Sequence, residues 1–352
     1  MSRWTYFAKR LLLSLPVVLL GTTLTFAMIR LGPLSPADAL AGQQGGQAVE
    51  NIKTELGLTR PLWEQYIGYM TDLLTFDLGQ SWVFRENTPT IDLIESFAPR
   101  TIWLGFWSVL IALFVGIPLG FYAGLNPNTT GDYVASFGGI VWRAMPNFWL
   151  AVILVVILTN QDLLFGFNWA DWLVDTNVIG PPPMTFVAVA TTSVFGIPIP
   201  TEIPTIYFGT LAAATKSIAP AALVLGSASM GNEMRIGRTA ILETKNAKYV
   251  ETARAKGVSR RALVWKHMFR NALIPLVPII LNEAFLLIGG SIIVETIFGI
   301  NGIGYMFYEA VINGDLPLAG SLAYIFILII VSLNILQDLL YTIIDPRVGY
   351  QE

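Results

Sequence analysis

Residues 316–337 read LPLAGSLAYIFILIIVSLNILQ, a run of 22 residues without one charged side chain. An α-helix rises about 1.5 Å per residue, so about 20 apolar residues cross the roughly 30 Å hydrocarbon layer of a bilayer. This stretch therefore predicts a membrane-spanning helix.

Five further stretches have the same apolar character: Leu11–Ile29, Ile102–Leu125, Ala144–Gln161, Ser217–Asn232 and Pro275–Val294. The third extends back to Tyr133 and then includes Arg143, while the fifth contains Glu283. Of all residues 54% are hydrophobic and 13% charged, with a mean hydropathy of +0.61, whereas a soluble domain has roughly 25% charged residues. The sequence thus predicts an all-α polytopic membrane protein with six transmembrane helices.

The composition excludes several kinds of chemistry. Cysteine is absent and His267 is the single histidine, which excludes disulfides, thiolate catalysis and Cys/His zinc sites. The net charge of −3 gives no basic excess for binding nucleic acid. No G-x-x-x-x-G-K-[S/T] stretch occurs, so any ATP that the protein uses must be bound by another chain.

A seventh uncharged stretch, residues 178–201, is not expected to span the membrane. It contains five prolines, and each proline costs a helix interior about 3 kcal/mol. Only Met184–Ile197 lies between them, which is too short for a span. We expect an outer loop or a re-entrant segment here.

The distribution of charge predicts the orientation, because Lys and Arg gather on the cytoplasmic side of membrane proteins. The segment between the fourth and fifth spans holds ten of the 21 basic residues: Arg235, Arg238, Lys245, Lys248, Arg254, Lys256, Arg260, Arg261, Lys266 and Arg270. In contrast, residues 160–215 contain four acids and no base, and residues 31–99 contain nine acids and three bases. We expect the basic segment and both termini to be cytoplasmic and the two acidic segments to be outside.

The basic segment contains Tyr249-Val250-Glu251-Thr252-Ala253-Arg254-Ala255-Lys256-Gly257 and then Ser259. Gly257 can adopt the left-handed conformation that ends a helix, and Ser259 can cap the next one, so two short helices should meet at Gly257. The small side chains of Ala253 and Ala255 would allow a partner surface to come close. On the residues alone, a basic amphipathic loop resting on anionic lipid explains the segment equally well.

The Glu251-Thr252-Ala253-x-x-x-Gly257 pattern resembles the E-A-A-x-x-x-G loop in membrane subunits of binding-protein-dependent ABC importers. The general family has I-x-L-P nine residues after the glycine, whereas this chain has His267-Met268-Phe269-Arg270. That variant is similar to the oligopeptide/dipeptide/nickel branch. Further resemblances follow in order along the chain: Glu55-Leu56-Gly57-Leu58, Asp77-Leu78-Gly79 with Ser81, Gly116-Ile117-Pro118-Leu119-Gly120, Pro146-x-Phe148-Trp149-Leu150, Val294-Glu295-Thr296-x-Phe298 with Gly302-x-Gly304, and Asp345-Pro346-Arg347.

The resemblance implies the type I ABC importer permease fold and a peptide substrate, with nickel or oligosaccharides as alternatives. It implies no catalysis by this chain and no cofactor on it, since ATP and Mg²⁺ would be bound by two cytoplasmic ATPase subunits. The other partners implied are a homologous second permease subunit and an extracytoplasmic solute-binding protein. The residues implied to couple to the ATPase are Tyr249, Glu251, Thr252, Ala253, Arg254, Ala255, Lys256 and Gly257.

The predicted organisation places the chain in the cell membrane as a multi-pass protein. Its parts are a cytoplasmic end and first span (1–31), an extracytoplasmic segment (32–100), a core permease domain (101–345) with an outer insert (160–215) and the coupling loop (235–272), and a cytoplasmic tail (346–352). The first span should remain uncleaved, because its 19 apolar residues exceed the 7 to 15 of a signal peptide.

Arg143 and Glu283, with neighbouring Asn282, lie within predicted spans. A charge at the bilayer centre costs about 2.5–3.5 kcal/mol on insertion scales, so it usually faces a partner or a water-filled path. These residues could line the translocation path or pair with each other. Alternatively, Arg143 reaches the cytoplasmic interface and Glu283 is protonated or satisfied within its helix. An ion-coupled secondary transporter using the same two charges is the competing function.

Overall fold

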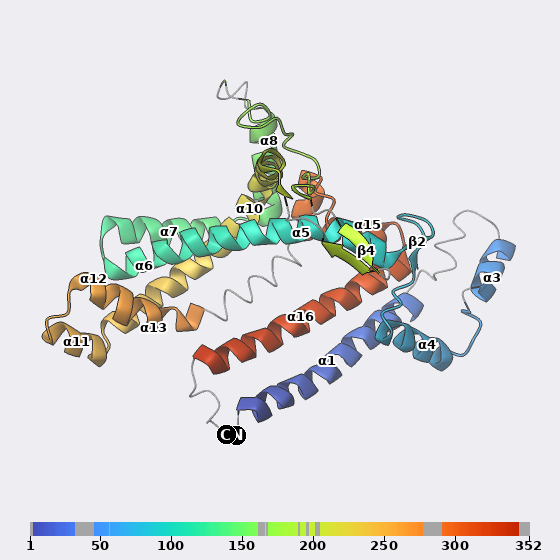
Figure 1. Cartoon of the computed structure of the whole chain (residues 1–352), viewed down its shortest axis with the longest axis horizontal. Helices are drawn as coiled ribbons and strands as arrows, with labels where there is room; N and C mark the ends of the chain where they lie inside the picture. Colours follow the sequence, from blue (N-terminus) through green and yellow to red (C-terminus); the bar gives the residue numbers. More distant parts are fainter. Residues whose placement is uncertain are drawn as a thin grey trace. The chain divides into compact units, whose positions relative to one another are not determined.

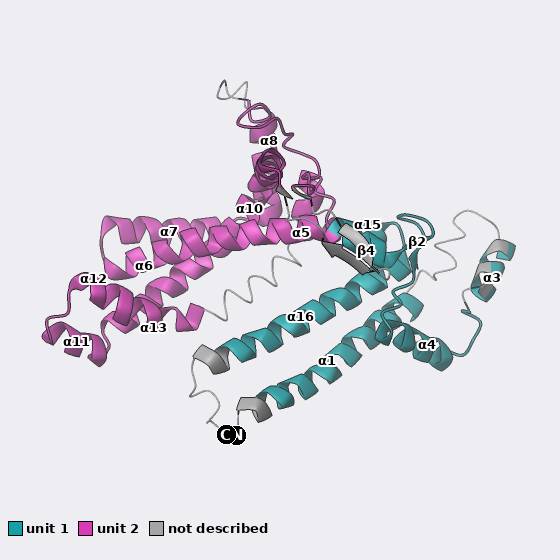
Figure 2. Cartoon of the chain, in the orientation of Figure 1, with its two compact units in different colours: residues 1–97, 277–285, 306–352 teal, residues 98–276, 286–305 magenta. Residues whose placement is uncertain are grey.

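The computed structural model describes residues 3–31, 46–55, 57–160, 166, 168–188, 191–194, 197–200, 205–276 and 291–344. Most of these residues are helical, as Figure 1 shows. The chain divides into two compact units, coloured in Figure 2. Unit 1 comprises residues 1–97, 277–285 and 306–352, and unit 2 comprises residues 98–276 and 286–305.

Two long helices form the main part of unit 1: α1 (Arg3–Leu31) and α16 (Leu316–Ile344). They run antiparallel, because Arg10 Nε lies 3.2 Å from Asp338 Oδ2 near one end while Gly320 lies against Ile29 near the other. Their large apolar side chains are widely exposed, as expected for helices whose environment is lipid.

Shorter elements close one end of unit 1: α3 (Gly46–Glu55), α4 (Leu62–Leu74), β1 (Gln80–Ser81) and β2 (Thr88–Pro89). The two strands pair antiparallel, with Gln80 opposite Pro89 and Ser81 opposite Thr88. Leu73, Leu78 and Tyr324 form a small buried cluster that holds α4 and the following turn against α16. Seven acids between residues 46 and 97 are exposed, namely Glu50, Glu64, Asp72, Asp77, Glu86, Asp92 and Glu95.

A 36-residue helix, Thr90–Leu125, contributes most of its length to unit 2. It consists of α5 (Thr90–Ile111), a π-helical turn (Ala112–Gly116) and α6 (Ile117–Leu125). It is followed by α7 (Thr130–Arg143) and α8 (Asn147–Thr159), which meet at an angle of 97°. Pro146 caps α8, and a proline disfavours helical backbone in the residue before it, so the chain bends here.

The 38-residue helix α10 (Phe208–Lys245) is the central element of unit 2 and packs against α6, α7 and α8. Ile218, Ala221, Ala222 and Leu225 of this helix are buried in the core together with Phe298. At its C-terminal end the chain continues into a series of short helical segments: α11 (Lys248–Ala255), α12 (Arg260–Ala262), a π-helical segment (Leu263–Phe269), α13 (Arg270–Ala272) and a 3-10 turn (Ile274–Leu276).

The described part of the insert 160–215 contains short strands and no helix before α10. The strands are β3 (Val187–Ala188), β4 (Thr191–Val194), β5 (Ile197–Pro200) and β6 (Thr205–Ile206), with β3 paired to β6 and β4 to β5. The prolines therefore exclude a seventh span here, as predicted. Lys216 of α10 donates hydrogen bonds to the carbonyl groups of Ala170 and Val174, which ties the preceding loop to the helix.

The described residues contain four helices long and apolar enough to span a membrane: Phe7–Leu31, Thr90–Leu125, Phe208–Lys245 and Leu316–Leu340. Two bent pairs raise this number to six if each is one crossing: α7 with α8, and Ser291–Phe298 with α15 (Ile303–Ile312), the latter bent by 90°. The first, second, fourth and sixth predicted spans are confirmed as helices, and the third is a bent pair. Most of the fifth, including Asn282 and Glu283, lies outside the described residues, so that span stays a prediction. The predicted class, an all-α multi-pass membrane protein, is confirmed.

Candidate functional site

The segment of residues 248–262, here called the coupling segment, forms two short helices that meet at Gly257. After the C-cap Lys256, Gly257 has φ +75°, and the amides of Gly257 and Val258 donate to the carbonyls of Arg254 and Ala253 at 3.0 and 3.2 Å. These two bonds form the Schellman motif that ends a helix. Ser259 then accepts a 3.4 Å hydrogen bond from the Ala262 amide and caps α12. The local geometry predicted from the sequence is confirmed.

The coupling segment has one buried side and one free side. Val250 and Ala253 are 0% and 8% exposed and pack against the rest of unit 2. The other seven candidate residues are exposed: Tyr249, Glu251, Thr252, Arg254, Ala255, Lys256 and Gly257. Ala253, which we expected to allow a partner to come close, therefore contributes to the packing of α11, whereas Ala255 and Gly257 leave open space for a partner.

Two residues, Asn246 and Ala247, separate α10 from α11, so the coupling segment is attached almost directly to the longest helix of the unit. Lys245, the last residue of α10, donates a 3.2 Å hydrogen bond to the Leu125 carbonyl at the end of α6. A cavity of about 370 Å³ opens beside this junction and is lined by Lys245, Arg254 and Arg260. Three cationic side chains thus surround a space next to the exposed face of the segment.

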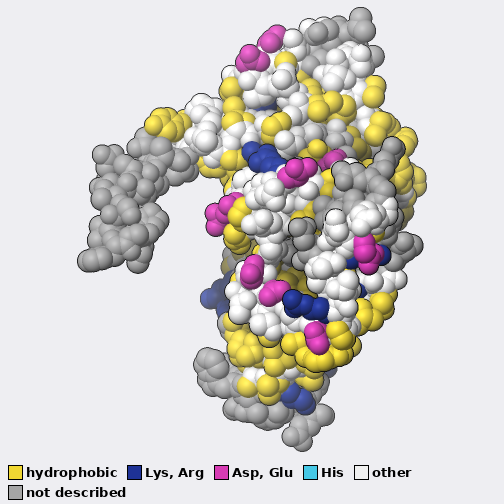
Figure 3. All heavy atoms as spheres, turned by 90° about the vertical axis from the view of Figure 1, so that its right-hand side faces the viewer, with side chains coloured by type: hydrophobic (Ala, Val, Ile, Leu, Met, Phe, Trp, Pro, Cys, Tyr) yellow, Lys and Arg dark blue, Asp and Glu magenta, His cyan; other side chains and the backbone are white. Residues whose placement is uncertain are grey.

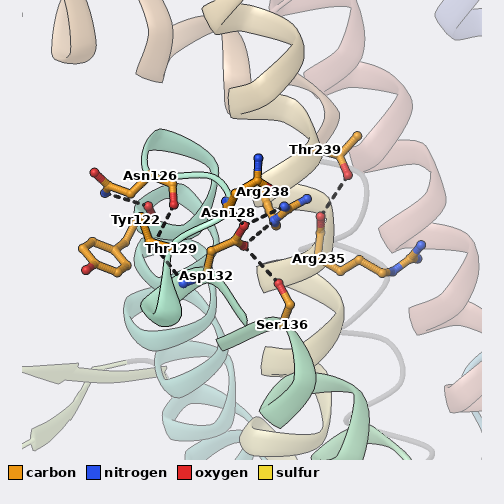
Figure 4. Close-up of polar contacts among 9 residues, drawn as sticks. All are labelled: Tyr122, Asn126, Asn128, Thr129, Asp132, Ser136, Arg235, Arg238 and Thr239. Carbon is orange, nitrogen blue, oxygen red and sulfur yellow. Dashed lines mark hydrogen bonds and ion pairs between the residues drawn. The ribbon is translucent and has the colours of Figure 1, made fainter. Parts of the chain in front are cut away.

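A buried ion pair joins α7 to α10 near the same junction (Figure 4). Arg238 Nε and Nη2 donate to Asp132 Oδ1 and Oδ2 at 2.6 and 2.8 Å, which is the bidentate geometry of a strong charge-assisted contact. The Asp132 carboxylate also accepts hydrogen bonds from the Asn128 amide at 2.9 Å and from Ser136 Oγ at 3.2 Å. With its side chain 2% exposed, Asp132 holds the α6–α7 turn firmly against α10.

Glycines allow α6 and α10 to come unusually close. A Cβ atom at Gly116 would lie 2.8 Å from the Met230 carbonyl oxygen, and one at Gly124 would lie 2.8 Å from that of Arg238. Gly120, one turn from each, lies against Met234 in the same way. Small residues at every fourth position give this close helix contact in membrane proteins. Consequently α6, α7 and α10 form a firmly packed support for the coupling segment.

A second polar staple, in unit 2, explains two patterns that the sequence showed without a physical reason. Glu295 is completely buried and accepts hydrogen bonds from Thr101 Oγ1 at 2.8 Å and from the Tyr305 amide at 2.9 Å. A Cβ at Gly302 or Gly304 would lie 2.6 or 3.0 Å from Glu295 Oε2, so the Gly302-x-Gly304 pair leaves the space for this carboxylate. Thr101 in turn accepts a 2.8 Å hydrogen bond from the Ile303 amide.

Of the candidate pathway residues, only Arg143 lies in the described part of the chain. It is exposed at the end of α7 and its Nη1 donates to Asn232 Oδ1 at 3.3 Å. It also lines a cavity of about 330 Å³ with Arg235 and Arg238. Since Asn282 and Glu283 lie outside the described residues, a pair between Arg143 and Glu283 stays a prediction. In the described part of the chain, no three acids or histidines gather in a way that could hold a metal ion.

Sequence reasoning missed Asp132, Arg238 and Asp315 as organising residues. Arg238 was counted only as one of the positive charges, and Asp132 was not singled out, because 106 residues separate the pair. The available signal was local: Thr129 precedes an acidic first turn and accepts a 3.3 Å hydrogen bond from the Asp132 amide, a helix-start pattern. That pattern predicts a cap but not the arginine that the carboxylate also binds.

Comparison with known proteins identifies the family. Residues 116–350 match the family described as binding-protein-dependent transport system inner membrane component, and residues 3–101 match the N-terminal part of such components. The chain therefore belongs to this family of multi-pass membrane permease components. Dipeptide transport system permease protein DppB of Alkalihalophilus pseudofirmus is 33% identical over 98% of this chain and 99% of its own length.

Two further relatives have similar coverage. Oligopeptide transport system permease protein AppB of Bacillus subtilis is 30% identical over 98% of this chain and 99% of its own length. Dipeptide transport system permease protein DppB of Escherichia coli K12 is 30% identical over 99% of both chains. The crystal structure of an amino acid ABC transporter is similar with a TM-score of 0.45 and 14% identity, over 71% of this chain and 94% of that one. The predicted permease family is confirmed.

Proposed function

We propose that this chain is a permease subunit of an ATP-driven importer of short peptides and forms half of the translocation path with a homologous second subunit. The observation that carries the proposal is the coupling segment, whose exposed residues sit at the end of the 38-residue helix α10. The names of the relatives, which are 30–33% identical over nearly the whole chain, support peptides as the substrate.

In this proposal the exposed face of α11 and Gly257 docks on a cytoplasmic ATPase subunit. Two such subunits bind ATP and Mg²⁺, and this chain binds neither. When the ATPases close, the docked segment moves with them. Because only two residues join it to α10, and because Arg238 binds Asp132 bidentately, that movement reaches α6, α7 and α10 together. The glycine contacts between α6 and α10 leave little room for the helices to slide independently.

The basic cavity beside the segment suits carboxylates of the ATPase. Lys245, Arg254 and Arg260 all line it, and none of the residues around it is acidic. An Asp or Glu from the partner would gain charge-assisted hydrogen bonds there. Contacts of this kind fix the orientation of docking more than they add to its affinity.

The proposed orientation puts the coupling segment and both termini in the cytoplasm. The opposite side would then carry the acidic surface of residues 46–97, where a solute-binding protein delivers the peptide. Acidic side chains are indeed spread over the face of the molecule in Figure 3, with hydrophobic side chains between them. Basic residues on the binding protein would complement this surface.

Reconstitution in proteoliposomes tests the proposal. The complete transporter, with both permease subunits, the ATPase and the binding protein, should take up a labelled dipeptide only when ATP is hydrolysed. A nonhydrolysable ATP analogue is the matched control and should give no uptake. Uptake that needs a sodium or proton gradient but no ATPase would show a secondary transporter. ATP-dependent uptake of nickel or an oligosaccharide without peptide uptake would overturn the substrate and leave the importer assignment standing.

A further inference from the structure

Unit 1 contains a cavity of about 240 Å³ that the transport mechanism does not use. It is bounded by the last turns of α1, by α4, by the turn that follows α4 and by the first turns of α16. Its walls include Phe26, Leu73 and Leu78, and its polar groups come from Arg30, Tyr69, Asp72 and Asp77. The cavity is therefore apolar with a few charged groups, which is typical of ligand sites.

The position of the cavity along the two spans is informative. Arg30 lies in the last turn of α1, and Leu316 is the first residue of α16, with which α1 runs antiparallel. Both helices are apolar enough to span the membrane, so the cavity lies where both spans end. That is the depth of lipid headgroups. On the same end of α1, Leu24, Met28 and Leu31 are 64%, 77% and 67% exposed, which leaves an apolar surface for acyl chains.

The cavity lacks an anion. Arg30 is the only base that lines it, and its Nη1 is buried without a hydrogen-bond partner among the described residues. The Tyr69 hydroxyl is likewise buried and unpartnered within that set. Burial raises the pKa of Tyr69 to about 12, so the hydroxyl is a neutral donor at physiological pH. A guanidinium and a hydroxyl in these surroundings suit the several acceptor oxygens of a phosphate.

The rim has the opposite charge. Asp72 and Asp77 are exposed, and in the described part of the chain neither forms an ion pair with Arg30. Partial burial, and then the charge of Asp77, raise the pKa of Asp72, so a cation at this place would relieve both. An ammonium group with N–H donors fits two neighbouring carboxylates, whereas a trimethylammonium group cannot donate to them.

We propose that this cavity binds the headgroup of an aminophospholipid, with the phosphate at Arg30 and Tyr69 and the ammonium group at Asp72 and Asp77. The acyl chains lie along the exposed apolar side of α1. A cationic interior with an acidic rim recognises a zwitterion, and the level at which the two spans end identifies that zwitterion as a lipid. The site makes this subunit selective for phosphatidylethanolamine over phosphatidylcholine and phosphatidylglycerol of equal chain length.

Native mass spectrometry of the purified full chain, titrated with each of the three lipids, tests the proposal. We expect phosphatidylethanolamine to bind best. Arg30→Gln should weaken its binding about tenfold or more, because a hydrogen-bonded charge is lost. Arg60→Gln is the matched control, since Arg60 is an exposed arginine of the same unit that does not line the cavity. The double variant Asp72→Asn, Asp77→Asn should lose the preference for phosphatidylethanolamine over phosphatidylcholine.

Further arms keep the result decisive. Tyr69→Phe keeps the ring and removes only the hydroxyl, so it replaces Arg30→Gln if that variant does not fold, and it should weaken binding severalfold. Equal binding of the three lipids, or equal effects of Arg30→Gln and Arg60→Gln, would overturn the site. Displacement of the lipid by a dipeptide at millimolar concentration would show a peptide site instead. Displacement by inorganic phosphate alone would show a simple anion site and exclude the role of the two aspartates.

Discussion

Asp315 accepts a 2.6 Å hydrogen bond from Ser81, which lies 234 residues earlier in the chain. The same carboxylate accepts hydrogen bonds from the backbone amides of Trp82, Val83 and Phe84 at 3.0–3.1 Å. Asp315 is completely buried and immediately precedes α16, so one side chain fixes the start of a span to the β1–β2 turn. The Asp77-Leu78-Gly79-x-Ser81 pattern noted in the sequence thus leads directly into an anion-binding turn.

Replacing Asp315 by Asn should destabilise unit 1 by about 2 kcal/mol, because hydrogen bonds to a charged group contribute about 1.5–3 kcal/mol and the amide offers one acceptor fewer. The apparent melting temperature of the purified protein in detergent should fall. Asp92→Asn, at an exposed acid of the same unit, is the control and should change it little. If both variants melt alike, the turn is held by contacts other than this carboxylate.

The space around Glu295 gives a second prediction. Gly302→Ala would force a Cβ to within 2.6 Å of the Glu295 carboxylate, and overpacking of this kind costs about 1–3 kcal/mol. Thermal unfolding should therefore begin at a lower temperature. Gly105→Ala, in α5 of the same unit, meets no atom within 4 Å and should be neutral or slightly stabilising. A neutral Gly302→Ala would show that the carboxylate has room to shift.

Gly257→Val should leave membrane insertion unchanged but weaken copurification of the ATPase subunits and abolish transport. A β-branched residue at φ +75° is strained by at least about 1–2 kcal/mol, so the turn between α11 and α12 would change direction. Gly257→Asn is the matched control, because asparagine tolerates the left-handed conformation and should retain most activity. Normal ATPase binding and transport by the valine variant would remove the coupling assignment.

A charge reversal tests the exposed face independently of the backbone. Glu251→Lys should weaken ATPase association without lowering protein abundance, since Glu251 is exposed on α11. Glu64→Lys makes the same change on the exposed surface of α4 in unit 1 and should have no effect on that association. Equal ATPase recovery with both variants would argue that Glu251 is not part of the docking face.

The sequence predicted the spans better than their ends. Uncharged runs identified the second and fourth spans, but Thr90–Leu125 and Phe208–Lys245 are longer, because helix continues into segments that carry charge on one side. The bend at Pro146 was not assigned, since a proline next to an apolar run is compatible with a kink, a start or a break. Only the tertiary packing of α7 and α8 decides between them.

Local chemistry was also predicted more reliably than long-range pairing. Lys256, Gly257 and Ser259 predicted the helix end and the next cap, because both motifs depend on neighbours in the chain. The glycines at 116, 120 and 124 predicted a small-residue face, but nothing in their spacing identified α10 as its partner. Asp132 and Arg238 likewise meet only once α7 and α10 have packed together.

The Asp132–Arg238 pair can separate docking from transmission. Asp132→Asn leaves Arg238 without its carboxylate partner, and we expect a loss of about 2 kcal/mol, less than the 3–5 kcal/mol of a fully buried pair because Arg238 is 31% exposed. ATPase subunits should still copurify, since the coupling segment itself is intact. Peptide uptake per ATP hydrolysed should fall, because α7 and α10 would no longer move as one body.

Two further variants complete this test. Asp132→Asn with Arg238→Gln should recover stability relative to Asp132→Asn alone, which is the coupling that a double-mutant cycle measures. Arg235→Gln is the control: Arg235 lies one turn earlier on α10, is exposed and points away from Asp132 in Figure 4. If Asp132→Asn loses stability but keeps full uptake per ATP, the pair serves folding alone and transmission runs through the glycine contacts between α6 and α10.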